Sequence, residues 1–418
     1  MTELNIALTA VGGTVIVLGL LSQPLKRTVF AVPLLALLIG VLLGPQMLGL
    51  LHPHQWGDQR IILEQASRLT LCIGLMGVAL RLPPNYFRLH WRSMAVLLVL
   101  GIPLMFLSTG LLAYLLLGLP LGTAMLVGAV VSPTDPIVAT SIVTGNVAEK
   151  NLPERIRNML SAESGANDGL AYPVVLLPVL LLTRPAHEAW LHWLGRIVLW
   201  EVGGAVLLGI LLGLSAGYLL RWAETKKTIE QVSFLSITLA LSLLTLGSTK
   251  LMGTDGILAV FTAGISFDHV VGGGERAKEE SVQEAVNQFF TVPIFILFGL
   301  MLPWEQWNEL GCGGPVLALS VLLLRRLPVM FMLKPLVPQL KDRRDVLFAG
   351  WFGPMGVAAL FYAMMVLQRT GCEAAWTVGS LLVCSSLVAH GMTAAPFSRL
   401  YRRFGEDKLP VTNDYKEN

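Results

Sequence analysis

The chain is poor in charged residues. Only 14% of its 418 residues are Asp, Glu, Lys or Arg, against about 25% in an average soluble domain, and 54% are hydrophobic. A soluble protein of this length can bury a large core, but it cannot hide this much apolar sequence from water. The composition therefore predicts a membrane protein that lies in a lipid bilayer. The net charge of +3 gives no reason to expect a nucleic-acid partner.

Motifs of enzymes and of cofactor binding are also missing. The sequence has no HExxH, GxSxG, phosphate loop or GxGxxG, so intramembrane proteolysis and ATP-driven transport lack support. We expect neither an enzyme nor a bound cofactor. Cysteine is scarce, and Cys72, Cys312, Cys372 and Cys384 show no CxxC and no metal-ligand spacing. Cys312 and Cys372 fall in loops predicted to lie outside, so a disulfide and two unpaired thiols are both open.

Hydrophobic runs long enough to cross a bilayer recur from end to end. We expect thirteen membrane helices, over residues 4–23, 29–50, 62–80, 93–117, 120–144, 157–182, 195–220, 231–249, 254–271, 285–302, 314–334, 345–367 and 374–398. The first run has no basic flank before it and no small-residue cleavage site after it, so we expect a retained helix and not a signal peptide. One transmembrane domain therefore fills residues 1–400, and a short polar tail follows over 401–418.

Lys and Arg are distributed unequally between the expected connections. With the N-terminus outside, most of the 30 basic residues fall on the inside, and the outer connections hold only Arg60, Arg68, Arg184, Arg196, Lys250 and Arg369. This asymmetry follows the positive-inside rule, so it supports the thirteen-helix topology with a cytoplasmic C-terminus. Arg325 and Arg326 are left at membrane depth. Without a targeting segment, the chain is expected in a prokaryotic inner membrane as a multi-pass protein.

Two of the expected helices carry strong helix breakers. The fifth contains Val131-Ser-Pro-Thr-Asp-Pro136, and the twelfth contains Gly350-Trp-Phe-Gly-Pro-Met-Gly356. Pro and Gly inside a spanning segment remove backbone hydrogen bonds and open the helix. The two helices are seven elements apart, which is the pattern of two inverted six-helix repeats, helices 1–6 and 8–13. Interrupted helices at corresponding places in two repeats indicate a transporter with a binding site near the middle of the membrane.

An acidic patch lies near the start of the sixth expected helix. Glu163 and Asp168 precede a run from Leu170 to Leu182 that has no other charge. Carboxylates at membrane depth are costly, so such residues are functional by default. Asp168 and Ser164 share one helix face, and a carboxylate in a partly desolvated cavity can bind either a proton or a hard cation such as Na⁺ or Li⁺. The alternative is a structural carboxylate that caps a turn.

Neighbouring helices supply the rest of the expected site. Thr134 offers a carbonyl or hydroxyl oxygen to the cation from the unwound segment of the fifth helix. Asp135 either acts on the cation through water or neutralises the start of a half-helix. Glu163 requires a buried cationic partner, and we choose Arg326, although the sequence barely separates it from Arg325.

Two polar residues elsewhere receive structural roles. Asp255, in Gly253-Thr-Asp-Gly256, lies near an outer helix start and is expected to cap it. His390, in the last helix before Gly391, is expected to be a hydrogen-bonded packing residue. Neither residue enters the expected site.

The two broken-helix and acidic motifs together resemble a known family. Ser132-Pro-Thr-Asp-Pro136, followed one helix later by Glu163-Ser-Gly-Ala-Asn-Asp168, is similar to the monovalent cation:proton antiporter-1 family. This family includes bacterial Na⁺/H⁺ antiporters and eukaryotic sodium/proton exchangers. The Arg326-Leu-Pro and Gly350-Trp-Phe-Gly-Pro stretches extend the resemblance over essentially the whole chain. One departure is Met355, at a position where many relatives have an arginine.

The resemblance implies an all-α homodimer whose protomers have a dimerisation domain and a six-helix core with crossed, broken helices. It also implies elevator-like alternating access. In this family the residue matching Asp168 carries the cation or proton, and those matching Ser164 and the Thr134 backbone complete the coordination. Glu163 would pair with the arginine of helix eleven, and Asn167 would support the helix crossing. The Asn-Asp pair resembles the electroneutral branch, which exchanges one cation per proton.

We therefore expect exchange of Na⁺, or Li⁺, for H⁺. Exchange of K⁺ for H⁺ is the nearest alternative, because oxygen ligands alone do not fix the size of the cavity. A cation channel on the same scaffold is a further alternative, and proton coupling would distinguish the two. A sodium-coupled carrier of organic solutes would need a larger pocket, which the broken helices do not supply.

Overall fold

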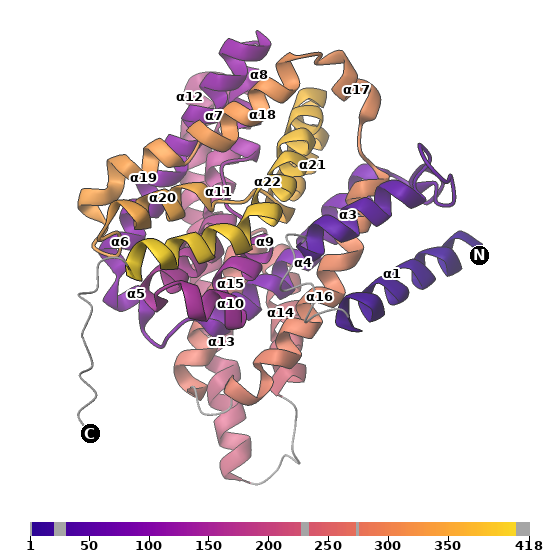
Figure 1. The fold of residues 1–418 in the computed structure, drawn as a ribbon. Helices are drawn as coiled ribbons and strands as arrows, with labels where there is room; N and C mark the ends of the chain where they lie inside the picture. Colours follow the sequence, from indigo (N-terminus) through magenta and orange to yellow (C-terminus); the bar gives the residue numbers. More distant parts are fainter. Residues whose placement is uncertain (1, 21–30, 227–233, 273–275, 407–418) are drawn as a thin grey trace, which may run out of the picture.

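The described part of the chain is built from helices. A computed structural model describes residues 2–20, 31–226, 234–272 and 276–406, and within these ranges it contains no β-strand (Figure 1). In chain order the elements are α1 (Thr2–Leu20), α3 (Val32–Leu43), η1 (Pro53–Gln55), α4 (Gln59–Arg81), α5 (Tyr86–Leu89), α6 (Trp91–Ala95), η2 (Val96–Gly101), α7 (Ile102–Leu117), α8 (Leu121–Val130), α9 (Pro136–Val143), α10 (Gly145–Asn151), α11 (Glu154–Thr183), α12 (Ala186–His192), η3 (Trp193–Val202), α13 (Gly203–Thr225), α14 (Phe234–Leu251), α15 (Gly256–Val271), α16 (Arg276–Leu300), α17 (Trp304–Glu309), α18 (Gly313–Leu324), α19 (Leu327–Leu333), η4 (Lys334–Leu336), α20 (Arg343–Trp351), α21 (Val357–Thr370) and α22 (Glu373–Glu406).

Many of these helices have the length and composition of membrane spans. In the described ranges, eight helical stretches are long and apolar enough to cross a membrane, and five shorter apolar helices have 10–17 residues. The chain is therefore an all-helical, multi-pass membrane protein. Thirteen crossings and inverted repeats remain predictions. The tail expected over 401–418 begins inside α22, and residues 407–418 lie outside the described part of the chain.

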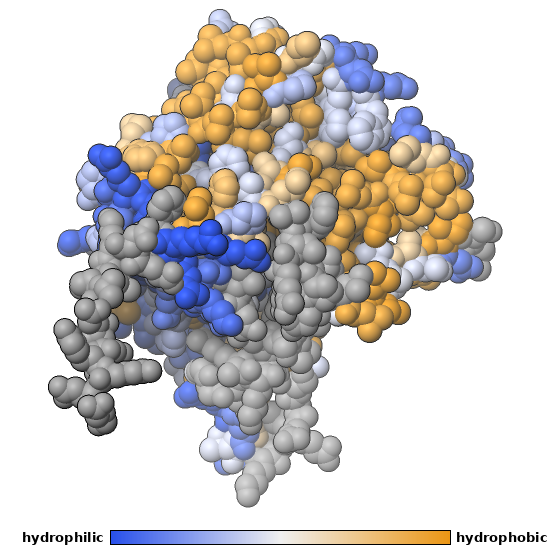
Figure 2. Space-filling model, viewed as in Figure 1, coloured by the Kyte–Doolittle hydropathy of each residue, from blue (hydrophilic) through white to orange (hydrophobic). Residues whose placement is uncertain are grey.

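The outer surface carries large apolar side chains. Figure 2 shows wide hydrophobic areas at the top of the view, over α7 and α18, and at the right, over α3 and α1. Exposed side chains of these helices include Leu107, Leu111 and Leu115 of α7, and Val316 and Leu319 of α18. A water-soluble monomer rarely exposes contiguous apolar areas of this kind, so these faces are suited to contact lipid.

Small residues allow the closest helix packing. α13 lies along α15 (Figure 1), and Gly209, Gly213 and Gly217 recur on α13 at every fourth position. A Cβ atom on Gly213 would lie 2.3 Å from the carbonyl oxygen of Ala263, so a larger residue would force the helices apart. Packing through small residues spaced by four is typical of membrane helices, because close backbone approach replaces the hydrophobic effect that lipid removes.

Within the described ranges, three segments of helix are interrupted inside the protein. The first interruption separates α8 from α9 over residues 131–135, and the second separates α20 from α21 over residues 352–356. Both breaks lie where the Pro and Gly motifs predict them. The third separates α18 from α19 at Arg325 and Arg326, inside a segment predicted as one helix over 314–334. Pro328 explains it, because its ring clashes with the turn before it and it lacks a backbone N–H.

Candidate cation site at the helix breaks

Asp135 caps two half-helices at once. Its Oδ1 accepts hydrogen bonds from the backbone N–H groups of Ile137, at 2.7 Å, and Val138, at 3.0 Å, at the start of α9. Its Oδ2 accepts one from the N–H of Val357, the first residue of α21, and its own N–H donates to the Pro354 carbonyl at 2.8 Å. One buried carboxylate therefore neutralises the positive ends of both half-helices. This geometry favours the capping alternative; Asp135 as a cation ligand remains a prediction.

Arg325 neutralises the negative, C-terminal ends of the two preceding half-helices. Its Nη1 donates to the carbonyl oxygens of Val131, Ser132 and Pro133, which follow α8, and its Nη2 donates to that of Gly353, after α20. The side chain is buried. A guanidinium is well suited here, because it carries five donors in one plane and the C-terminal ends of helices attract positive charge.

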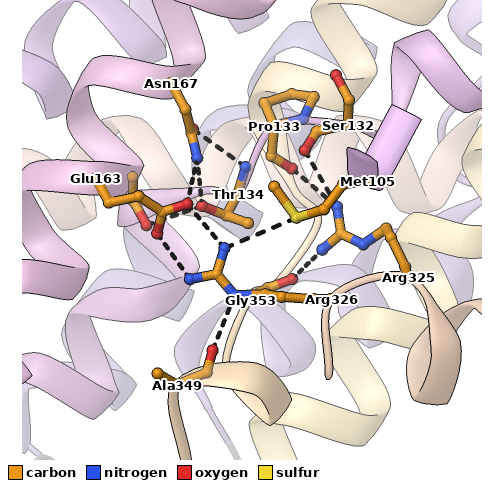
Figure 3. A network of polar contacts seen from close by, with 11 residues as sticks. Met105, Ser132, Pro133, Thr134, Glu163, Asn167, Arg325, Arg326, Ala349 and Gly353 are labelled. Atoms are coloured by element: carbon orange, nitrogen blue, oxygen red, sulfur yellow. Dashed lines mark hydrogen bonds and ion pairs between the residues drawn. The ribbon is translucent and has the colours of Figure 1, made fainter. Parts of the chain in front are cut away.

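Glu163 pairs with Arg326, and both side chains are buried. Arg326 Nη1 and Nη2 each lie 2.8 Å from one Glu163 carboxylate oxygen, and Arg326 Nε donates to the Ala349 carbonyl at 2.8 Å. Arg325 and Arg326 point in different directions from the α18–α19 break (Figure 3). Gly353 lies against Arg326, and a Cβ atom on Gly353 would come 2.2 Å from Arg326 Cδ. Any larger residue at Gly353 would displace the ion pair.

Asn167 joins this ion pair to the break in the fifth expected helix. Its Nδ2 donates to Glu163 Oε1 at 3.1 Å and to Thr134 Oγ1 at 2.6 Å, and its Oδ1 accepts the Thr134 N–H at 3.1 Å (Figure 3). Thr134 Oγ1 also lies 3.0 Å from Ser164 Oγ. All four side chains are buried. The network fixes the unwound Thr134 backbone against α11 and places two hydroxyl oxygens side by side.

Asp168 is the carboxylate that this scaffold leaves free. It is fully buried, and neither of its carboxylate oxygens has a hydrogen-bond partner among the described residues. Its backbone carbonyl accepts a hydrogen bond from the Tyr362 hydroxyl. Because buried polar atoms nearly always have partners, two orphaned oxygens on one residue need an explanation. A proton or a cation bound there would supply it.

A polar chain across the second break was missed by the sequence analysis. The Met355 N–H donates to Ser386 Oγ at 2.8 Å, Ser386 Oγ lies 2.9 Å from His390 Nδ1, and His390 Nε2 lies 2.9 Å from the Trp351 carbonyl. The Ser386 carbonyl also lies 3.0 Å from Nδ1, and because both carbonyls can only accept, the neutral ring donates to one of the two at a time. α22 therefore bridges the end of α20 to the unwound segment. His390 is hydrogen-bonded as expected, but only the fold shows what it holds together.

Two smaller expectations are settled by the geometry. Asp255 caps α15, since its Oδ1 accepts the Ile257 N–H at 3.0 Å. Cys312 and Cys372 are both free thiols in the structure. Among the residues described, no cluster of three or more His, Cys, Asp or Glu side chains could hold a metal ion.

Replacing Arg325 with glutamine is expected to destabilise the protein. The variant leaves buried carbonyl groups of both half-helix ends without a charged donor, and unsatisfied buried polar groups cost about 1–3 kcal/mol each. We expect a clear drop in the thermal unfolding temperature of the detergent-solubilised protein. Arg88→Gln, at an exposed position of α5, is the matched control. Equal unfolding temperatures for the two variants would show that Arg325 does not stabilise the breaks.

These features define a class of protein. Paired interrupted helices whose ends are neutralised by buried charges, around a free carboxylate, form the architecture of secondary transporters. A family model described as "Sodium/hydrogen exchanger, transmembrane" matches residues 11–400. The chain belongs to this family.

Individual relatives agree with this membership. The chain is 34% identical over 373 residues to Na⁺/H⁺ antiporter 2 of Zygosaccharomyces rouxii, covering 87% of this chain and 46% of that protein. It is 31% identical over 419 residues to a Na⁺/H⁺ antiporter of Schizosaccharomyces pombe, covering 94% of this chain and 89% of that protein. The chain thus spans less than half of the Z. rouxii relative. The sodium proton antiporter MjNhaP1 from Methanocaldococcus jannaschii has the same fold, with a TM-score of 0.76 at 18% identity over 97% of this chain and 99% of that one.

Proposed function

We propose that the protein is a secondary active transporter, not an enzyme, that exchanges Na⁺ or Li⁺ for H⁺ at Asp168. This proposal rests on the fully buried Asp168, whose two carboxylate oxygens have no hydrogen-bond partner among the residues that the structure describes. When a cation binds these oxygens, the carboxyl group must release its proton, because both cannot occupy the same lone pairs. One site with two exclusive occupants gives obligatory one-for-one exchange.

The neighbouring hydroxyl groups would complete the cation's coordination. Thr134 Oγ1 accepts the Asn167 amide, so its own hydrogen can turn toward Ser164. The Ser164 oxygen, on the same face of α11 as Asp168, then keeps a lone pair for the cation. Hard monovalent cations prefer such carboxylate, hydroxyl and carbonyl oxygens. Glu163 is held by Arg326 and serves as scaffold.

The remaining features of the proposal follow the family. We propose thirteen spans with inverted repeats, an elevator-like motion of a core against a dimerisation domain, and a homodimer. We also propose a multi-pass inner-membrane location with the N-terminus outside. The Lys and Arg distribution supports this orientation. The names of the Z. rouxii and S. pombe relatives support Na⁺ as the cation.

The test is proton flux in proteoliposomes that contain the purified protein. A pH-sensitive dye inside the vesicles should report alkalinisation when Na⁺ or Li⁺ is added outside, because entering cations drive protons out, and little change with K⁺. An imposed membrane potential should not alter the rate, because one-for-one exchange moves no net charge. Proton flux with K⁺ instead of Na⁺ would indicate K⁺/H⁺ exchange. Cation flux without proton movement would indicate a channel and would reject the proposal.

A further inference from the structure

A second buried carboxylate with a free oxygen lies where α14 turns into α15. Asp255 is 6% exposed, and its Oδ1 is used by the Ile257 N–H that it caps. Its Oδ2 has no hydrogen-bond partner in the described part of the chain. Its backbone N–H donates to the Glu201 carbonyl at 3.0 Å, which fixes the turn against η3. Capping therefore accounts for one oxygen of Asp255 and leaves the other unexplained.

Asp255, which carries this free oxygen, borders a cavity near the helices that hold Asp168. Asp255 and Thr254 line this cavity of about 210 Å³ together with Tyr172 of α11 and with residues of α4, α14 and α21. Tyr172 follows Asp168 by one helical turn on α11. On α21 the cavity is bordered by Phe361, and the next residue, Tyr362, donates its hydroxyl hydrogen to the Asp168 carbonyl. The cavity thus lies between the helices of the transport site and α4, α14 and α15, about one turn from Asp168.

The other charged residues of this cavity are better solvated than Asp255. Lys250 and Arg369 are exposed, so water and salt screen their charges. Glu64 and Arg68 are both half-buried and lie one turn apart on α4, a spacing that favours opposite charges. Because the Asp255 carboxylate is buried, water and salt screen its electric field inside the cavity less than they screen those of the other charged residues.

Glu201, the acidic residue bonded to the Asp255 backbone, is already engaged. It lies 3.1 Å from Arg196 Nε and accepts the Tyr172 hydroxyl at 2.6 Å. Its charge is therefore largely satisfied, which leaves Asp255 as the acidic group available to a cation that enters. At about 30 Å³ per water molecule, the cavity has room for a cation that keeps part of its hydration shell.

We propose that Asp255 Oδ2 is a second cation-binding site, which takes up partly hydrated Na⁺ or Li⁺ before it reaches Asp168. The inference rests on the proposed exchange function and extends it to the entry route. The site serves the side of the membrane where α14 meets α15, predicted to be external. Asp255 also neutralises the start of α15, so it binds the cation weakly and releases it inward.

The test measures exchange with the cation supplied from one side at a time. Asparagine keeps an oxygen to cap α15 and removes the negative charge. In right-side-out and everted membrane vesicles, Asp255→Asn should raise the half-saturating Na⁺ concentration about three- to tenfold from the external side and leave the other side unchanged. Glu64→Gln, which removes one negative charge from the same cavity, is the matched control and should change this value by less than about twofold.

Several outcomes would overturn the proposal. Unchanged half-saturation in Asp255→Asn, or an equal change from both sides, would mean that the residue is only a cap. A changed pH profile without a changed Na⁺ dependence would mean that it binds a proton and no cation. If the asparagine variant does not fold, Asp255→Ser replaces it in the test, because serine also caps a helix. If neither variant folds while Glu64→Gln does, Asp255 has a structural role and the proposal is rejected. Absence of Na⁺-driven proton flux in the wild-type protein would instead reject the proposed function.

Discussion

Replacing Asp168 with asparagine should abolish Na⁺-induced proton movement in proteoliposomes. Asparagine has nearly the same size, so the packing of α11 is preserved, but its amide can neither release a proton nor carry a negative charge. Both half-reactions of the exchange are lost together, and the rate should fall to that of empty vesicles. The protein should remain folded, because no hydrogen bond in the described structure uses the Asp168 carboxylate.

The matched control is Asp58→Asn. Asp58 is exposed and caps α4 through its Oδ1, which accepts the Arg60 N–H at 2.9 Å. Asparagine is an equally good capping residue, so this variant loses one negative charge without losing its structural bond. It should exchange like the wild-type protein. Undiminished exchange by a correctly folded Asp168→Asn protein would contradict the assignment of Asp168 as the carrier.

The sequence predicts where the helices break better than it predicts which side chains stabilise the broken ends. Pro133 and Pro136 lack backbone donors, so a break between them follows from local chemistry, and the structure places the gap at residues 131–135. The break before Pro328 has the same local cause, but we predicted a continuous helix there. The signal was present in the Leu327-Pro328 pair. A single proline in a membrane helix often only kinks it, so its consequence depends on neighbours that the sequence does not show.

The choice between Arg325 and Arg326 shows where the sequence stops being informative. The two residues are adjacent at a helix break, and their directions depend on backbone angles that neither side chain determines. The fold turns Arg326 toward Glu163 and Arg325 toward the carbonyl oxygens of the broken ends. Composition and depth predicted that one of them needed a buried partner. Which of the two pairs with Glu163 is decided by the fold around the α18–α19 break.

Asp135 and Arg325 also bring charge to the break that contains Met355. The Met355 side chain itself is uncharged, and its backbone N–H donates to Ser386 Oγ. Arg325 reaches the same segment from another helix and donates to the Gly353 carbonyl, two residues earlier. The positive charge beside the two breaks thus comes from Arg325, at the α18–α19 break. With Asp135 at the opposite half-helix ends, the four ends are neutralised in pairs.

Removing one member of the buried ion pair is expected to have the largest effect on stability. Glu163→Gln leaves the Arg326 guanidinium buried, at 3% side-chain exposure, without a counter-charge. Breaking a buried pair in this way costs about 3–5 kcal/mol, because the remaining charge is neither solvated nor paired. The variant should unfold at a much lower temperature in detergent. Exchange should also fall, because glutamine offers one acceptor oxygen in place of two, so Arg326 and Asn167, which orients Thr134, must share it.

An exposed ion pair supplies the control. Arg60 Nη2 lies 2.9 Å from Glu373 Oε1, with side-chain exposures of 49% and 63%, and such surface pairs contribute about 0–1 kcal/mol. Glu373→Gln should therefore hardly change the unfolding temperature. The double variant Glu163→Leu with Arg326→Met removes both buried charges and should recover much of the lost stability, since a hydrophobic replacement of a buried pair is often neutral. If Glu163→Gln unfolds like Glu373→Gln, the buried pair does not stabilise the fold. If the double variant is stable but exchanges slowly, the pair matters for the geometry around Thr134 more than for folding.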